Sequence, residues 1–300
     1  MECPEFIEGL GPVKHQPGAS RIFLLGVQAM RRVNRHRALP VVLAAAMAFG
    51  TAACDVNIGG GDFNLGVASG RASDEWTRTY KVAPGGQFEV LNVNGQVQVE
   101  PATGSDVEVR AERIAKASTD EAAKELLGKV EMAETTTAGG VKVETKAPKN
   151  FGRGGVEVKY FVKVPSGIKV SAQTTNGGIR LINLPNQVVA STVNGGVNGD
   201  GLSGAVEATT TNGGIDLSVG AVAEGGIKAE TVNGGVVVSL PRDAKADVRA
   251  SVVNGGLSVG DLPITTVGEQ SRRRLEGKLN GGGPRIVIGA VNGGVRLAGK

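Results

Sequence analysis

The sequence predicts an all-β protein: a single-stranded β-solenoid (β-helix) of stacked Asn-Gly-Gly coils, with one short helix in the N-terminal half. Three observations predict it. Glycine makes up 47 of the 300 residues and aromatic residues only 3%, which suits glycine at fixed positions of a regular architecture. The tripeptide Asn-Gly-Gly occurs seven times in the second half of the chain. Apolar and polar residues alternate on both sides of it, as in strands with one buried face.

Each coil reads as a strand, an Asn-Gly-Gly corner, a second strand and a looser return. Before most corners, Val or Ile stands six residues upstream of the asparagine, Ala four upstream and Thr two upstream. One such unit cannot bury its own apolar face, whereas stacked units can. We expect like residues to stack at the inter-strand spacing of about 4.8 Å, which would line up the asparagine amides as a ladder. The predicted ladder contains Asn176, Asn194, Asn212, Asn233, Asn254, Asn280 and Asn292.

Asn-Gly is also typical of the type I′ turn of a β-hairpin, which is the alternative for each corner. Hairpins would explain one corner but not the same inward register in successive units, so the solenoid is favoured. Asn94 with Gly95 is an isolated relative of the repeat. Asn280 is preceded by Glu276 and Lys278 where other coils carry Ala and Thr, so the last coils are expected to pack differently.

The folded domain is expected at residues 76–300, with irregular strands over 76–170 and regular coils over 171–300. The one helix lies in the first part. Ser118 and Glu121 form a capping box that opens it, and a glycine after the second leucine ends it.

The segments before this domain indicate export. Residues 30–53 have a basic start, an apolar run too short to span a bilayer and small residues at the end, which is the pattern of a signal peptide. Residues 1–29 are then a mis-annotated extension in front of the true initiator, Met30. Residues 54–75 are rich in Gly, Asn, Asp and Ser and are expected to form a flexible tether.

Cys54 follows the signal peptide and resembles the lipidated cysteine of a bacterial lipoprotein. The alternative is ordinary cleavage after Ala53, which would leave Cys54 as a free thiol in an oxidising compartment. Lipidation is the favoured interpretation, and it predicts a protein of the periplasm or cell surface that meets the membrane only through its anchor.

The net charge of +4 belongs mostly to the export signal. Six of the 33 Lys and Arg residues and three of the 29 Asp and Glu residues precede Cys54, so the remainder carries a net charge of +1. The remainder therefore lacks the basic stripe that nucleic-acid binding requires.

The residues of the repeats do not suggest catalysis or a cofactor. Both histidines, His15 and His36, precede Cys54, so a His–Cys metal site is excluded in the mature chain. No Trp, Tyr or Phe follows Phe161, so the coils lack an aromatic platform for a sugar or a base. Trp76 and Tyr80 are expected to cover the N-terminal end of the solenoid.

Residues 76–300 resemble the bacterial putative-adhesin family of otherwise unknown function, which is related to GIN-domain adhesin heads and toast-rack solenoids. The resemblance rests on Val93-Asn94-Gly95, on Val162-Lys163-Val164-Pro165 leading into the first coil, and on the serial Asn-Gly-Gly corners. It implies a single-stranded β-helix on an envelope protein with no known catalytic residues.

The favoured function is thus a non-catalytic cell-envelope protein, an adhesin-like or scaffold solenoid anchored through Cys54 that contacts an envelope protein or another surface macromolecule. Self-association is a further option, because residues 295–297 end the chain as a strand without an evident cap. The alternatives are a β-helix polysaccharide lyase or hydrolase, which would need a carboxylate pair, and a partner in envelope-stress sensing.

Overall fold

The computed structural model describes residues 70–148, 154–268 and 270–300, and every structural statement below concerns these residues. They form 21 strands in two sheets and one helix, α2 (Asp120–Gly128), which confirms the prediction of an all-β fold with one short helix. The predicted extension, signal peptide and Cys54 lie outside the described residues. None of the described helical structure is long and apolar enough to span a bilayer.

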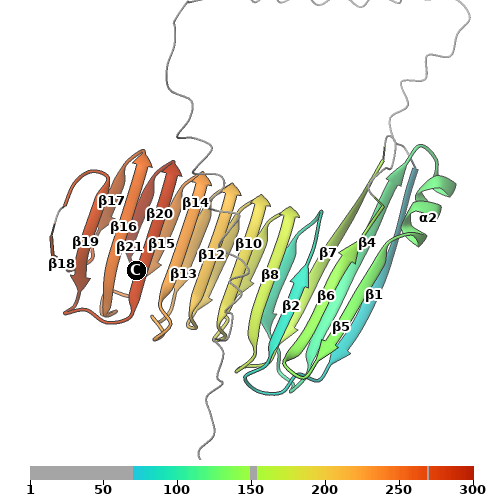
Figure 1. Cartoon of the computed structure of the whole chain (residues 1–300), viewed down its shortest axis with the longest axis horizontal. Coiled ribbons are helices and arrows are strands. Elements are labelled where there is room, and N and C mark those ends of the chain that lie inside the picture. The colour runs from blue at the N-terminus through green and yellow to red at the C-terminus, as the bar shows by residue number, and fades with distance from the viewer. Residues whose placement is uncertain (1–69, 149–153, 269) are drawn as a thin grey trace, which may run out of the picture. The chain divides into compact units, whose positions relative to one another are not determined.

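The two sheets lie face to face with the core between them (Figure 1). Sheet A contains, in spatial order, β1 (Gly70–Tyr80), β4 (Val107–Ala117), β7 (Gly155–Val164), β3 (Val97–Pro101), β9 (Ile179–Ile182), β11 (Val197–Leu202), β13 (Ile215–Val219), β15 (Val236–Leu240), β21 (Val295–Gly299) and β17 (Leu257–Gly260). Sheet B contains β18 (Ile264–Thr266), β19 (Arg274–Leu279), β16 (Ala246–Asn254), β20 (Arg285–Asn292), β14 (Ile227–Asn233), β12 (Val206–Asn212), β10 (Val188–Asn194), β8 (Lys169–Asn176), β2 (Gln87–Leu91), β6 (Gly140–Lys146) and β5 (Glu131–Thr137).

From β8 to β15 the chain crosses from sheet B to sheet A at each Asn-Gly-Gly corner and then returns to sheet B. Successive strands pair in parallel with like residues opposite each other, as with Ala190 and Ala208 of β10 and β12. The Val, Ala and Thr rows of sheet B point inward and are buried, and they meet buried rows of sheet A such as Ile215 and Leu217. The period-two alternation of the sequence therefore places one face of each strand in the core.

At the corners that cross from sheet B to sheet A, the first glycine lies against the backbone of the neighbouring coil. A Cβ on Gly213 would lie 1.9 Å from the carbonyl oxygen of Gly195, and one on Gly195 would lie 2.0 Å from that of Gly177. The second glycine is less confined, since a Cβ on Gly214 would meet its nearest atom, the oxygen of Gly235, at 3.4 Å. The corner thus needs glycine at its first position because the backbones of adjacent coils approach too closely for any side chain.

The coils do not stack in chain order at either end of the sheets. β2 and β3 lie between β6–β7 and β8–β9, although β6 and β7 follow them in the sequence. At the other end, β20 and β21 lie between β14–β15 and β16–β17, and Figure 1 shows β20 between β14 and β16. A uniform stack in chain order is therefore wrong at both ends, because the antiparallel pairs β4–β7 and β16–β19 reverse the chain.

Asn280 does not belong to the asparagine ladder, contrary to the prediction. It follows β19, which runs antiparallel to β16, and it has a φ of 48° with Gly281 and Gly282 at 90° and 95°. Its Nδ2 donates to the carbonyl oxygens of Arg242 and Ala244, both at 2.8 Å. This tripeptide turns the chain from β19 into β20 within sheet B instead of crossing to sheet A, so the expectation that the chain packs differently here is confirmed.

The C-terminal strand is not a sheet edge. β21 pairs with β15 on one side and β17 on the other, so the prediction that residues 295–297 expose an edge for self-association is wrong. The edges at this end are β17 in sheet A and β18 in sheet B. The residues of β21 give no indication that this strand lies between two strands that precede it in the chain.

At the opposite end, β1 begins at Gly70, so residues 70–75 of the predicted tether (54–75) are strand. β1 is an edge strand paired with β4, and most of its residues are exposed. It therefore lacks the apolar alternation that would identify a strand. A Cβ on Gly70 would lie 2.0 Å from the backbone carbon of Thr119, and Arg113 Nε of β4 donates to Asp74 Oδ1 at 2.8 Å.

Helix α2 begins one residue later than the capping box predicted. Its N-cap is Thr119 and not Ser118, because Ala122 N donates to Thr119 Oγ1 at 3.2 Å. Ala123 and Leu127 are the buried residues of the helix and join the core. The helix lies beside β1 and β4 (Figure 1).

We expect Gly213→Ala to lower the free energy of unfolding by about 1–3 kcal/mol, the usual cost of overpacking, because its Cβ would overlap the oxygen of Gly195. Gly214→Ala is the matched control in the same corner, and we expect it to change stability by no more than about 0.5 kcal/mol. Urea unfolding of both variants measures the difference. Equal losses would contradict the account of the corner.

Candidate functional site

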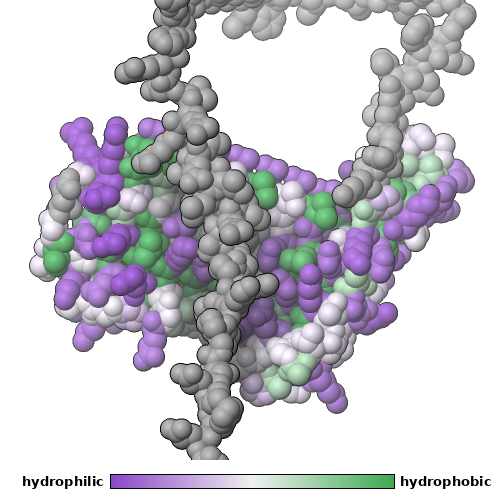
Figure 2. Space-filling view, in the orientation of Figure 1, coloured by the Kyte–Doolittle hydropathy of each residue, from purple (hydrophilic) through white to green (hydrophobic). Residues whose placement is uncertain are grey.

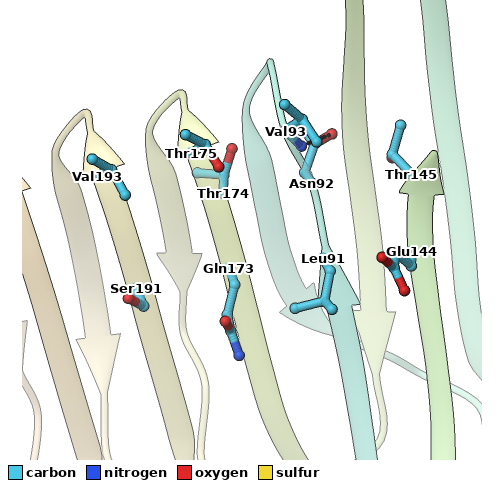
Figure 3. A pocket seen from close by; sticks show the side chains of 10 residues that line it. All are labelled: Leu91, Asn92, Val93, Glu144, Thr145, Gln173, Thr174, Thr175, Ser191 and Val193. Carbon is cyan, nitrogen blue, oxygen red and sulfur yellow. Dashed lines mark hydrogen bonds between the residues drawn. The ribbon is translucent and has the colours of Figure 1, made fainter. Parts of the chain in front are cut away.

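A hollow of about 290 Å³ opens on the outer face of sheet B, and we call it the β2 groove. It lies across β6, β2, β8 and β10 near the end of β2, as Figure 3 shows. Its lining residues are Leu91, Asn92, Val93, Glu144, Thr145, Gln173, Thr174, Thr175, Ser191 and Val193.

The groove exists because sheet B divides at the end of β2. β2 and β6 pair in parallel as far as Leu91 and Glu144. Beyond Leu91, Asn92 turns its side chain inward, and Nδ2 donates to the carbonyl oxygens of Val158 at 2.7 Å and Gly95 at 3.1 Å. This ties the chain after β2 to β7 of sheet A, while β6 continues along β5. The space between the two paths is the groove.

One lining residue of the groove, Thr145, belongs to a buried hydroxyl pair. Thr145 Oγ1 and Tyr160 Oη lie 2.6 Å apart, and the side chain of Tyr160 is fully buried. Burial raises the pKa of Tyr160 to about 12, and the hydrogen bond with Thr145 opposes part of that rise. The phenol is therefore neutral at physiological pH and supports the groove as a fixed neighbour of Thr145.

The walls are polar and the rim is β-branched. Gln173 Nε2 donates to Glu89 Oε1 at 3.2 Å, and Glu144 lies 3.3 Å from Lys142 Nζ. At the rim, Val93 and Val193 are each 43% exposed. Such a surface offers amide, hydroxyl and carboxylate groups beside small apolar contacts.

The rim belongs to a row that continues along the coils. At every corner where the chain crosses from sheet B to sheet A, the residue immediately before the asparagine is β-branched and at least partly exposed, and we call this set the β-branched row. In spatial order it contains Val93, Thr175, Val193, Thr211, Val232, Val291 and Val253.

Beside this row, seven asparagine side chains form one continuous hydrogen-bonded line, the asparagine ladder. Six of the seven donate Nδ2 to the Oδ1 of the asparagine in the spatially preceding coil, at 2.7 to 2.9 Å, and the first, Asn94, donates to the carbonyl oxygen of Val156. In spatial order the members are Asn94, Asn176, Asn194, Asn212, Asn233, Asn292 and Asn254. Six of the seven residues named from the sequence thus lie together, Asn280 lies elsewhere, and Asn94 joins them.

A second line of bonds lies just inside the ladder. The buried threonines two residues before the corners donate to a glycine carbonyl of the preceding coil, for example Thr192 to Gly177 at 2.9 Å and Thr210 to Gly195 at 2.8 Å. Asn92 occupies the equivalent position before Asn94. Asn92 was not predicted from the sequence as a site residue. Its position two residues before an asparagine of the ladder could have indicated it, but only if Asn94 with Gly95 had been recognised as a full corner.

The described residues contain no group of three or more His, Cys, Asp or Glu side chains that could hold a metal ion. Several carboxylates pair with cations on exposed faces, such as Glu230 with Lys228 at 3.5 Å and Asp261 with Arg242 at 3.6 Å. A second hollow of about 310 Å³ lies at the sheet A side of the corners, lined by Gln96, Gly178, Ile179, Arg180 and Asn198.

A protein-family model described as Toastrack DUF4097 matches residues 86–298. A search among curated proteins gives no match. Among solved structures, a putative cell adhesion protein from Clostridium sporogenes is similar over 76% of this chain and 100% of its own, with 11% identity and a TM-score of 0.45.

Two further solved structures are similar. A putative adhesin from Bacteroides fragilis matches over 76% of this chain and 97% of its own, with 11% identity and a TM-score of 0.29. A putative lipid binding protein from Parabacteroides distasonis matches over 75% and 96%, with 11% identity and a TM-score of 0.27. These values are too low for the names of the three proteins to bear on the function of this one.

The two tyrosines of the chain predict loss of stability at high pH. Burial, followed by the hydrogen bond to Glu134 at 2.7 Å, raises the pKa of Tyr80, and burial raises that of Tyr160 to about 12. An unfolded tyrosine ionises near pH 10. Both groups therefore bind protons more tightly in the folded state, and their contribution, complete below about pH 10, is lost as pH rises toward 12.

Phenolate absorbance measured against pH checks this expectation. The folded protein should show no tyrosine titration near pH 10, and denaturant unfolding should show stability falling above that pH. Tyr80→Phe removes one of the two groups and should leave the Tyr160 titration in place. A full-amplitude titration near pH 10 in the folded protein would contradict the prediction.

Proposed function

The chain belongs to the Toastrack DUF4097 family, and we propose that it is a non-catalytic protein of the bacterial cell envelope, a scaffold or adhesin-like β-solenoid that contacts another macromolecule. In this proposal the Asn-Gly-Gly corners are the corners of the solenoid coils. The chain is exported, and a lipid on Cys54 holds it to a membrane through the segment before β1.

The observation that carries the proposal is that the polar residues inside the coils bond to one another and to the backbone. The corner asparagines bond to one another, and the threonines of four coils bond to glycine carbonyls of the preceding coil. These groups hold the frame and are not arranged around a substrate. A partner would then contact the side chains that point outward from the coils.

The β2 groove and the β-branched row are the outward features that suit contact with a macromolecule. They offer small apolar side chains beside amides and hydroxyls. The β-branched side chains have few rotamers, so they lose little conformational entropy when a partner binds. In Figure 2, hydrophilic residues project around both ends of the sheets, and hydrophobic ones show between them on the visible face. Mixed surfaces of this kind are typical of non-obligate interfaces.

Site-specific crosslinking in intact cells tests the contact. A photo-reactive amino acid at Val193, on the rim of the groove and 43% exposed, should yield a crosslinked macromolecule. The matched control is Asp216, which is exposed on the outer face of sheet A, and it should yield none. Equal crosslinking at both positions, or none at either, would contradict the groove as the contact surface.

Replacement of Cys54 tests the anchor. Cys54→Ser should move the protein from the membrane fraction to the soluble fraction, because the thiol is the only group to which the lipid would attach. Ser69→Ala, which changes another residue of the segment between Cys54 and β1 and keeps Cys54, should leave the fractionation unchanged. Unaltered membrane association of Cys54→Ser, or an N-terminus at Cys54 without a lipid mass, would rule the anchor out.

A further inference from the structure

We propose that Asn254 is a spontaneous modification site, the one Asn-Gly-Gly corner that deamidates readily in the folded protein. Deamidation at Asn-Gly begins when the backbone nitrogen of the glycine attacks the side-chain amide carbon of the asparagine. The sequence is the same at all seven corners. Asn280 lies outside the ladder, and among the six corners of the ladder one, at Asn254, lies at the end of the line of bonds.

Inside the ladder, three hydrogen bonds oppose the reaction. At Asn194, Nδ2 donates to Asn176 Oδ1 at 2.8 Å and Oδ1 accepts from Asn212 Nδ2 at 2.9 Å, so the amide is held at both ends. The attacking nitrogen, that of Gly195, donates to the carbonyl oxygen of Asn212 at 3.0 Å. The side chain must leave the ladder and the glycine must leave its acceptor before the ring can close.

The same three bonds recur along the ladder. The corner glycine nitrogens of Gly177, Gly213, Gly234 and Gly293 each donate to the asparagine carbonyl of the next coil at 2.9 Å. These first glycines are partly buried against the preceding coil.

Asn254 lies at the end of the ladder and keeps only one of these bonds. Its Nδ2 donates to Asn292 Oδ1 at 2.9 Å. No further coil stacks on this corner within the described residues; the neighbouring backbone is that of Arg272 and Arg273, whose carbonyl oxygens accept from the N–H groups of Leu257 and Val252. Among the described residues, no donor reaches its Oδ1 and no acceptor receives the N–H of Gly255. Asn254, Gly255 and Gly256 are all exposed, so water and hydroxide reach the nucleophile and the leaving group.

Asn280 provides a contrast outside the ladder. Both of its Nδ2 hydrogens are donated to carbonyl oxygens, those of Arg242 and Ala244, at 2.8 Å. The amide is therefore held in place in a way that Asn254 is not, and its reaction is expected to be slower.

The reaction needs only water and base. The Gly255 nitrogen loses its proton to hydroxide and bonds to Cγ of Asn254, the Cγ–Nδ2 bond breaks, and the nitrogen leaves as ammonia after taking up a proton. Water then opens the cyclic imide at either carbonyl, which leaves aspartate or isoaspartate at position 254. No oxidant, reductant or cofactor takes part.

The product loosens the last coil. Position 254 loses the N–H that bonded to Asn292 Oδ1 and gains a carboxylate that places an acceptor against an acceptor. Isoaspartate also adds one atom to the backbone at the corner between β16 and β17. β17 is the edge strand of sheet A, so we expect it to be released first.

Peptide mapping by mass spectrometry of the full chain, incubated at mildly alkaline pH, tests the proposal. Asn254 should deamidate at least about tenfold faster than Asn194 or Asn212, the ratio given by one lost hydrogen bond of about 1.4 kcal/mol. It should also react faster than Asn280. Rates should rise with pH because the attacking nitrogen must lose a proton.

The unfolded chain in denaturant is the control for intrinsic reactivity, and there the seven corners should react at similar rates. Asn254→Gln should abolish the fast phase without changing the other sites, and Asn254→Asp should increase amide hydrogen exchange in β17 while leaving β13 protected. Equal rates at Asn254 and Asn194 in the folded protein, or a faster reaction at Asn280, would overturn the proposal.

Discussion

The structure depends on one constraint: the corners of neighbouring coils must approach at the spacing of hydrogen-bonded strands. At that spacing the first corner glycine leaves no room for a Cβ, with neighbouring carbonyl oxygens about 2 Å from where it would lie. The asparagine beside it reaches its counterpart in the next coil and bonds to it. Glycine and asparagine therefore recur together because the same close approach requires both.

The coils follow chain order in the middle of the stack but not at its two ends. Antiparallel strands reverse the chain, and the first and last coils, β2–β3 and β20–β21, are inserted between neighbours. An inserted coil is hydrogen-bonded on both sides, so it cannot fray independently as the terminal unit of a sequential solenoid would. The exposed edges fall instead to β1, β5, β17 and β18, which are short, polar or paired with a hairpin.

Departures from the repeat coincide with the places where the surface becomes distinctive. Asn92 stands where the coils carry threonine, and its bond to Val158 helps to open the β2 groove. Within the described residues no coil stacks beyond Asn254, so its Oδ1 and the N–H of Gly255 have no hydrogen-bond partner, although its Nδ2 is still bonded to Asn292. In the regular coils, the asparagine amides, the threonine hydroxyls and the glycine N–H groups are hydrogen-bonded within the fold. They are therefore not available to bind a ligand or to react.

The sequence by itself determined the strands, the inward rows and the stacking of like residues, because these depend on alternation and repetition within short stretches. It also identified six members of the asparagine ladder. The tertiary structure alone decided the order of the coils, which brought Asn94 into the ladder, excluded Asn280 and put β21 inside sheet A. Equivalent coils present equivalent pairing edges, so no local pattern specifies which coil neighbours which. That choice is made by the antiparallel reversals at each end and by the core that they close.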